Sequence, residues 1–297
     1  MKKMFRDSEL QNKFEQDGYV VVPFLDADML KNILEFYATV RQEHEITSSV
    51  HSTSDTNNES LIRLVDSKLK FIIKEKIATL LFECRIFLSN FLIKEPDIES
   101  RISPHQDWTF VDEKQFASAS IWCPLTDIDA QTGRISVIKG SHRFIETLRA
   151  PPDSPSAFEP VSSELDTYLL PLSIKAGDAL IYNHALIHAS EPNLSKLQRP
   201  VAVWAVVPEE AQLLLHYYHP APAKRKLEKF EVDTDFFYQY AKNSRPYGKY
   251  SKGFIDYEFK QITTDDFFKM VGDKKIKPAQ KQPQESLLMR IFRLFTA

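Results

Sequence analysis

The stretch that decides the fold of this chain is Gly177 to Ser190, GDALIYNHALIHAS. Gly177-Asp178 is a turn signal, and the apolar run 179–182 that follows is typical of a buried strand. His188 then lies where a strand end would meet a cleft. We therefore expect a β-rich core that presents a histidine at its edge.

Short β-prone runs lie on both sides of this stretch. Turn signals separate them, among them Thr132-Gly133 and Lys139-Gly140-Ser141. Many short strands at fairly regular spacing predict a sandwich or barrel. The runs cover 85–93, 117–125, 135–138, 168–174, 179–182, 201–207 and 212–218.

The chain before residue 85 predicts mainly helices. Ser8 and Gln11 fit a capping box for a first helix, which ends at Asp17-Gly18. A β-branched run over 19–22 predicts a strand, and Asp26 can cap the next helix.

A third helix is expected over 67–82, where apolar residues recur at helical spacing. The polar segment 46–60 between these helices has no periodicity. We interpret it as a surface loop, with a mobile lid over a pocket as the alternative.

Composition limits the classes of function. The formal charge of −3 gives no general attraction to nucleic acid. Cys84 and Cys123 both lie in apolar runs, which favours reduced, buried thiols. The first ten residues lack the apolar core of a signal peptide, and no run reaches the length of a membrane span. The expected location is the cytoplasm.

The residues with the clearest chemistry are His105 and Asp107, read with His188. In an extended segment, residues two apart point to the same face, so one strand end can offer an imidazole and a carboxylate to one ion. Two histidines and one carboxylate form the facial triad that holds Fe(II) and leaves three positions open. His184 shares a strand face with His188 and is an alternative ligand.

Arg199 adds a second element to this site. A guanidinium can bind a carboxylate through two hydrogen bonds, which fits the far carboxylate of 2-oxoglutarate. Ser190 can add a hydroxyl to the same group.

These motifs together resemble the phytanoyl-CoA dioxygenase family of Fe(II)/2-oxoglutarate oxygenases. The matching stretches are PHQDW at 104–108, GRISVIKGSH at 133–142, and the segment from Gly177 through His188 to Arg199. The resemblance extends over about 85–207, and the opening at 17–21 is also similar. It implies a mainly β fold with flanking helices, built on a double-stranded β-helix (jelly-roll, cupin-like) core.

The resemblance also implies roles for single residues. His105, Asp107 and His188 would bind iron, which favours His188 over His184. Arg199 would pair with 2-oxoglutarate, with Ser190 assisting, and Lys94 resembles a position that contacts the co-substrate in some members. A surface lysine is the alternative for Lys94. Related halogenases lack the carboxylate that Asp107 provides, so hydroxylation or another oxidation is favoured over halogenation.

The expected helices and strands, with the extent of the resemblance, also predict the domain organisation. We expect one oxygenase domain over 1–272, with a helical N-terminal part (1–84), the β-helix core (about 85–220) and a helical C-terminal extension (221–272). Residues 273–297 predict a basic linker and an amphipathic helix. Its segment 286–296 would pack on the protein or a partner, or contact a membrane surface weakly.

The leading hypothesis is a dioxygenase that uses Fe(II), 2-oxoglutarate and O2. It would hydroxylate an unactivated C–H of a small organic or acyl substrate, free or linked to CoA or a carrier, and release succinate and CO2. Two alternatives stay open: a non-catalytic module that binds metal or 2-oxoglutarate, and a hydrolase that holds Zn at the same triad.

Overall fold

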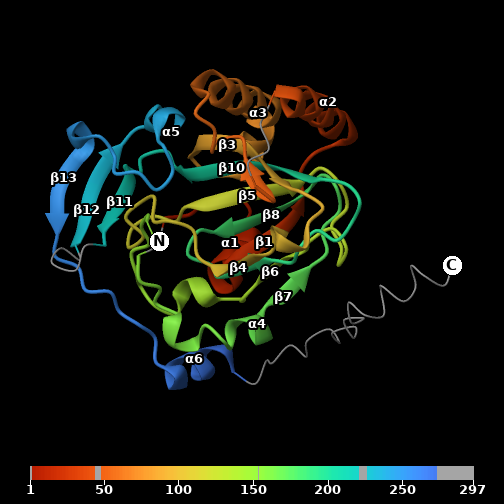
Figure 1. Cartoon of the computed structure of the whole chain (residues 1–297). Helices are drawn as coiled ribbons and strands as arrows, with labels where there is room; N and C mark the ends of the chain where they lie inside the picture. Colours follow the sequence, from red (N-terminus) through yellow and green to blue (C-terminus); the bar gives the residue numbers. More distant parts are fainter. Residues whose placement is uncertain (1, 44–47, 153, 221–225, 273–297) are drawn as a thin grey trace, which may run out of the picture.

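The core of the computed structural model consists of two antiparallel sheets that pack face to face (Figure 1). The structure describes residues 2–43, 48–152, 154–220 and 226–272. The larger sheet has the strand order β1-β8-β5-β10-β3-β2, and the smaller has the order β4-β9-β6-β7. Trp122 and Leu180 of the larger sheet share a buried cluster with Ile135 and Val137 of the smaller one. The predicted mainly β, jelly-roll fold class is therefore confirmed.

Strands β1, β3, β5, β6, β7, β8, β10 and β11 coincide with the predicted β-prone runs, whereas β2, β4, β9, β12 and β13 lie outside them. The bounds are β1 Tyr19–Pro23, β2 Val50–Ser52, β3 Cys84–Lys94, β4 Ile102–His105, β5 Ala119–Pro124, β6 Ile135–Val137, β7 Leu170–Leu172, β8 Asp178–Asn183, β9 His188–Ser190, β10 Arg199–Pro208, β11 Leu213–His219, β12 Lys226–Val232 and β13 Ser251–Ile255. The helices are α1 Ser8–Asp17, α2 Ala27–Glu43, α3 Glu59–Leu80, α4 Leu165–Tyr168, α5 Phe236–Gln239 and α6 Thr264–Val271. Single 3-10 turns lie at Ile98–Ser100, Ser141–Arg143, Glu159–Val161 and Gly248–Tyr250.

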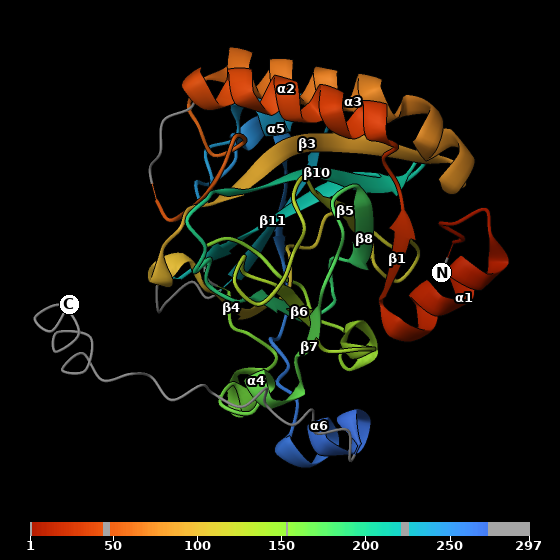
Figure 2. The same cartoon turned by 90° about the vertical axis from the view of Figure 1, so that its right-hand side faces the viewer.

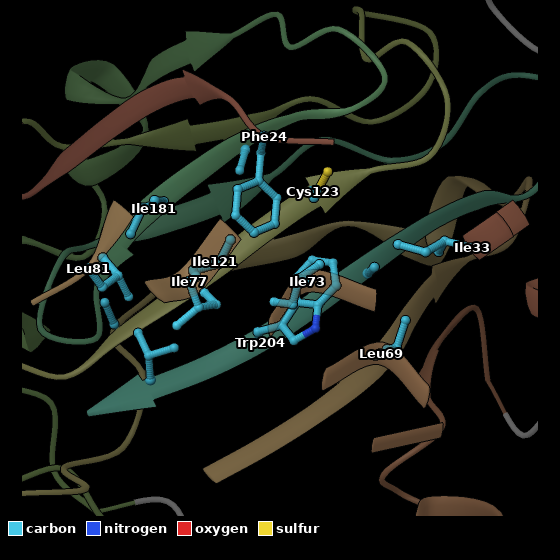
Figure 3. Packing of buried hydrophobic residues seen from close by; sticks show 14 of the residues in the cluster. Phe24, Ile33, Leu69, Ile73, Ile77, Leu81, Ile121, Cys123, Ile181 and Trp204 are labelled. Atoms are coloured by element: carbon cyan, nitrogen blue, oxygen red, sulfur yellow. The ribbon is translucent and has the colours of Figure 1, made fainter. Parts of the chain in front are cut away.

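Helices α2 and α3 cover the outer face of the larger sheet (Figure 2). The buried face of α3 packs Leu69 and Ile73 against Trp204 of β10 (Figure 3). Full burial of such a side chain contributes roughly 1.5–3 kcal/mol. The helices therefore leave the inner face of the sheet free to build a site.

Two helix starts differ from the expectation. Asp7, not Ser8, caps α1, because its carboxylate accepts the backbone N–H groups of Glu9 and Leu10. Gln11 instead accepts N–H groups from Met4 and Phe5. The third helix begins at residue 59 rather than 67, because Asn58 accepts the N–H of Leu61. Asp26 does cap α2, through the N–H of Met29.

The segment 46–60 is only partly a loop. Within its described residues, Val50 to Ser52 form β2, which pairs with Lys94, Ile93 and Leu92 of β3. The pairing with β3 explains the difference. Hydrogen bonds to this long strand order residues 50–52, although their own sequence has no clear pattern.

The extension 221–272 is not simply helical, which corrects the expectation. Strands β12 and β13 join β11 in a third antiparallel sheet, with Leu213 opposite Val232. Lysine and glutamate alternate with apolar residues in β12, and pairing with β11 overrides their low strand propensity. The helices α5 and α6 are the helical parts of this extension.

Two further expectations concern the chain as a whole. The single domain over 1–272 stays a prediction, and the predicted linker and helix at 273–297 lie outside the described residues. Among the residues that the structure describes, no helix has both the length and the apolar character needed to cross a bilayer.

Candidate active site

The structure brings His105, Asp107 and His188 together at the edge of the smaller sheet. His105 ends β4 and is the register partner of His188, which begins β9. One ligand atom from each residue lies within 4.8 Å of the others. The Oδ1 atom of Asp107 is 3.9 Å from Nε2 of both histidines. This triad therefore comes from two strands that are adjacent in the sheet and distant in the sequence.

Hydrogen bonds fix which nitrogen each histidine offers. Nδ1 of His105 lies 2.9 Å from the Ser103 carbonyl, and Nδ1 of His188 lies 3.0 Å from the Leu186 carbonyl. A carbonyl only accepts, so each Nδ1 donates and each Nε2 keeps a free lone pair. Burial lowers the pKa of His188 to about 4, and the nearby His105 adds to this effect. His188 is thus neutral at pH 7, the form that binds a metal.

Asp107 is held through its backbone as well as its side chain. Its N–H donates to the His184 carbonyl (2.9 Å), and its own carbonyl accepts from Nε of Arg149 (2.7 Å). Burial raises the pKa of the carboxyl group, but the surrounding imidazoles, His188 foremost, outweigh burial and leave the pKa below its ordinary value. The carboxylate is therefore charged at neutral pH.

His184 lies outside the triad. Its Nδ1 is 2.8 Å from the Ser118 hydroxyl and its Nε2 is 3.0 Å from the Ser120 hydroxyl. Because both ring nitrogens are hydrogen-bonded, the His184 ring is held in place next to the triad.

Tyr182 is a site residue that the sequence reading missed. Its ring centroid is 4.6 Å from that of His188, and burial next to Asp107 raises the pKa of its hydroxyl well above 10. One feature of the sequence could have indicated this role: Tyr182 ends the predicted strand 179–182, which comes shortly before His188.

A buried positive region lies beyond the triad, along β9 and β10. The guanidinium of Arg199 donates from Nη1 to the Gly133 carbonyl (2.7 Å), whereas its Nε has no partner among the described residues. Its centre lies 5.2 Å from the Trp122 ring. Arg199 is only 1% exposed, and this burial lowers its pKa to about 9. A buried guanidinium with an unused donor fits an anionic ligand.

Lys94 is buried in the same region and is not a surface lysine. It is the register partner of Arg199, and its Nζ donates to the Ser190 hydroxyl and the Glu191 carbonyl, both at 2.6 Å. Burial, together with the nearby charge of Arg199, lowers its pKa to about 6. The structure thus brings Lys94, Ser190 and Arg199 together in one buried region.

A cavity of about 390 Å³ opens onto the triad. His105 and Asp107 line it, and Trp122, Tyr182 and His184 form its inner end. The exposed fractions of the side chains are 41% for His105, 27% for Asp107 and 7% for His188. One side of the triad therefore faces the space where a substrate can enter.

Comparisons with known proteins agree with this site. The family model described as phytanoyl-CoA dioxygenase (PhyH) matches residues 14–201. The chain is 31% identical over 116 residues to phytanoyl-CoA dioxygenase 1 of Oryza sativa subsp. japonica, covering 38% of this chain and 41% of that protein. It is 29% identical over 118 residues to phytanoyl-CoA dioxygenase domain-containing protein 1 of Rattus norvegicus, covering 37% and 40%. The chain spans about two fifths of the length of these curated relatives.

Two solved structures share the fold. The epimerase SnoN, in complex with Fe3+, alpha ketoglutarate and nogalamycin RO, aligns with a TM-score of 0.51 and 20% identity, over 69% of this chain and 84% of that chain. The carbocyclase SnoK aligns with a TM-score of 0.50 and 19% identity, over 70% and 86%. Because the family model matches more than half of the residues and its motifs contain the triad, the chain belongs to the phytanoyl-CoA dioxygenase (PhyH) family.

Proposed function

We propose that this chain is an Fe(II)/2-oxoglutarate-dependent oxygenase that hydroxylates an unactivated C–H of a small organic or acyl substrate. The observation that supports this most strongly is the pairing of the triad with a buried, incompletely bonded Arg199. A metal site alone would suit several chemistries. A buried cationic region beside it suits a metal chelator that also bears a distant carboxylate.

The triad fits Fe(II) by its donor set. Two neutral imidazoles and one carboxylate are the ligands of non-haem Fe(II) oxygenases, and the cavity leaves one side of the triad open. Fe(II) and 2-oxoglutarate, when bound, supply the activation of O2, with succinate and CO2 as co-products.

The chain's own residues bind and orient the reactants. Arg199 pairs with the far carboxylate of 2-oxoglutarate, Ser190 adds a hydroxyl bond, and Lys94 supplies a second cation. Tyr182 stays protonated beside His188, and its hydroxyl hydrogen-bonds to Asp107, so it helps to orient that carboxylate.

Because Asp107 keeps the carboxylate ligand in place, hydroxylation or another oxidation is favoured over halogenation. SnoN is described as an epimerase and SnoK as a carbocyclase, so the shared fold accommodates other outcomes. Two free cysteines, Cys84 and Cys123, are consistent with a reducing cytoplasm.

An anaerobic titration tests the proposal. Metal-free protein receives Fe(II) and then 2-oxoglutarate, and the visible metal-to-ligand charge-transfer band is recorded. We expect the band in the wild type, its loss in His188→Ala, and weaker 2-oxoglutarate binding in Arg199→Leu. Arg143→Leu, at an exposed arginine, is the matched control and should bind like the wild type.

Three results would contradict the proposal. No band from folded protein would exclude the iron–oxoglutarate site, and hydrolytic turnover without O2 would point to a Zn enzyme. A band without succinate release on any substrate would instead indicate a binding module.

A further inference from the structure

The outer part of the cavity is built partly by residues beyond the segment that the family model matches. Strands β3 and β10 provide its floor, including Leu88, Asn90 and Val203. Phe237 of α5 and Tyr240 just after it provide one wall. At about 390 Å³, the cavity is in the lower range for small-molecule sites.

Helix α5 is fixed over the cavity by a buried polar contact. The hydroxyl of Tyr238 donates to Oδ2 of Asp66 in α3 at 2.5 Å, and Oδ1 of Asp66 accepts the N–H of Ser89 in β3 at 2.6 Å. Figure 1 shows α5 beside α3. Since Asp66 is 2% exposed, this contact ties α5 to the core.

The wall formed by α5 is aromatic and continues into the segment after β4. Ring centroids lie 6.0 Å apart for Phe110 and Phe237, 5.0 Å for Phe87 and Phe237, and 6.3 Å for Trp108 and Tyr240. Edge-on and tilted rings at these distances form a continuous apolar surface. The substrate would meet this surface immediately outside the triad.

The lining has little free charge. Asp55 and Lys242, its only charged residues outside the triad among those described, pair with each other at 3.0 Å. Both ring nitrogens of His184 are already hydrogen-bonded, to the Ser118 and Ser120 hydroxyls, so this residue offers no free group to a charged ligand. A charged substrate group in the cavity would lose water without finding a partner.

One polar group of the floor has no protein partner among the described residues. The side-chain amide of Asn90 lines the cavity from β3 and makes no hydrogen bond in the part of the chain that the structure describes. An amide can donate and accept, so it can bind one hydroxyl or carbonyl of a ligand.

We propose that Phe237 and Tyr240 complete the substrate site and that the cavity selects an uncharged, predominantly apolar molecule with one hydrogen-bonding group for Asn90. The inference rests on the proposed function, because it describes the substrate of that same site. It narrows the substrate to molecules that enter the cavity without a carboxylate or phosphate.

The test measures binding, not turnover. Full-length protein with Fe(II) and 2-oxoglutarate, kept anaerobic, is titrated with the uncharged fluorophore N-phenyl-1-naphthylamine. We expect saturable binding at one site, weakened about three- to tenfold in Phe237→Ala and in Tyr240→Ala. Ala205→Phe, which fills the cavity from β10, should abolish it. Phe71→Ala, at an aromatic residue 76% exposed on α3, is the control and should bind like the wild type.

Competition then tests the charge and the hydrogen bond. Octan-1-ol should displace the fluorophore at concentrations at least about tenfold below those of octanoate and octanoyl-CoA, and Asn90→Leu should remove part of the advantage of the alcohol. Equal or stronger displacement by octanoate or octanoyl-CoA would overturn the proposal, as would unchanged fluorophore binding in both aromatic variants.

The charge-transfer band separates the two proposals. A normal band in each variant shows that the protein is folded and that the metal site is intact. If octanoate or octanoyl-CoA then displaces the fluorophore as well as octan-1-ol does, only the substrate inference is overturned. Absence of the band in the wild type would overturn the proposed function as well.

Discussion

At the scale of the residue, Arg149 illustrates how a metal ligand is positioned. Its Nε donates to the Asp107 carbonyl at 2.7 Å, and its Nη1 donates to Glu113 at 2.8 Å. We expect Arg149→Met to weaken metal binding about 10- to 100-fold, because groups that orient ligands contribute on this scale. Metal competition with a coloured chelator measures the change.

A matched variant keeps this prediction specific. Arg101→Met removes an arginine whose ion pair with Asp166 is exposed, and it should leave metal affinity unchanged. Equal losses in both variants would indicate a general effect on stability and contradict the positioning role of Arg149.

A second prediction concerns protons. Burial lowers the pKa of Lys94 to about 6, so the amine is mostly neutral at pH 7.5 in the ligand-free protein. A carboxylate placed beside it favours the charged form and raises this pKa. We expect binding of 2-oxoglutarate at pH 7.5 to take up close to one proton, and to take up fewer below pH 6, where Lys94 is already charged.

Calorimetry in buffers of different ionisation enthalpy measures this uptake. In Lys94→Met the buffer dependence should largely disappear, although binding persists through Arg199. Uptake that is unchanged in Lys94→Met would assign the proton to another group.

The triad and the cationic Arg199 could be named from the sequence more readily than the residues that support them. His105, Asp107, His188 and Arg199 belong to ordered motifs, so they could be named in advance. Tyr182 and Arg149 could not, because their roles depend on contacts that only the folded chain creates. Lys94 was left undecided between surface and site, and its burial depends on the pairing of β3 with β10.

At the scale of the element, the turn between α1 and β1 depends on a glycine. Gly18 has φ +83°, and a Cβ there would lie 2.5 Å from Nδ1 of His142 and 2.6 Å from Cδ1 of Leu186. We expect Gly18→Ala to lower the free energy of unfolding by about 2–4 kcal/mol, from backbone strain plus steric overlap. Urea denaturation measures the change.

Gly253 provides the control for that substitution. Its φ is +89°, but a Cβ there would meet nothing within 4 Å. Gly253→Ala should therefore cost only the strain, about 1 kcal/mol. A cost as large as that of Gly18→Ala would show that packing around Gly18 is not responsible.

Elements with strong patterns were predicted well, and those that depend on a neighbour were not. The apolar runs of β5, β8 and β10 identify buried strands from composition alone. In contrast, β2 is three residues long and β12 is rich in lysine and glutamate, so both depend on the strands beside them. The N-caps of α1 and α3 differ from the predicted ones, because Asp7 and Asn58 accept the first backbone N–H groups of these helices.

At the scale of the whole molecule, ligand binding should stabilise the fold. Metal and 2-oxoglutarate bind only the folded chain, so a hundredfold excess over the dissociation constant adds roughly 2.7 kcal/mol. For a chain of this length we expect Tm to rise by about 3–5 °C when Mn(II) and 2-oxoglutarate are added. Differential scanning fluorimetry measures the shift.

The same experiment includes its own control. Succinate has two carboxylates but no keto group to chelate a metal, so it should give a much smaller shift. An equal shift with succinate would mean that the cationic region alone binds the ligand.

The pairing of His105 with His188 has one more consequence. The two residues are 188 − 105 = 83 positions apart, yet they face each other across β4 and β9. An ion that binds both histidines joins two strands that are distant in the sequence, and because it binds only the folded chain it stabilises the state in which these strands are paired. Removal of the ion would therefore weaken the contact between β4 and β9, so the metal site also helps to hold the smaller sheet together.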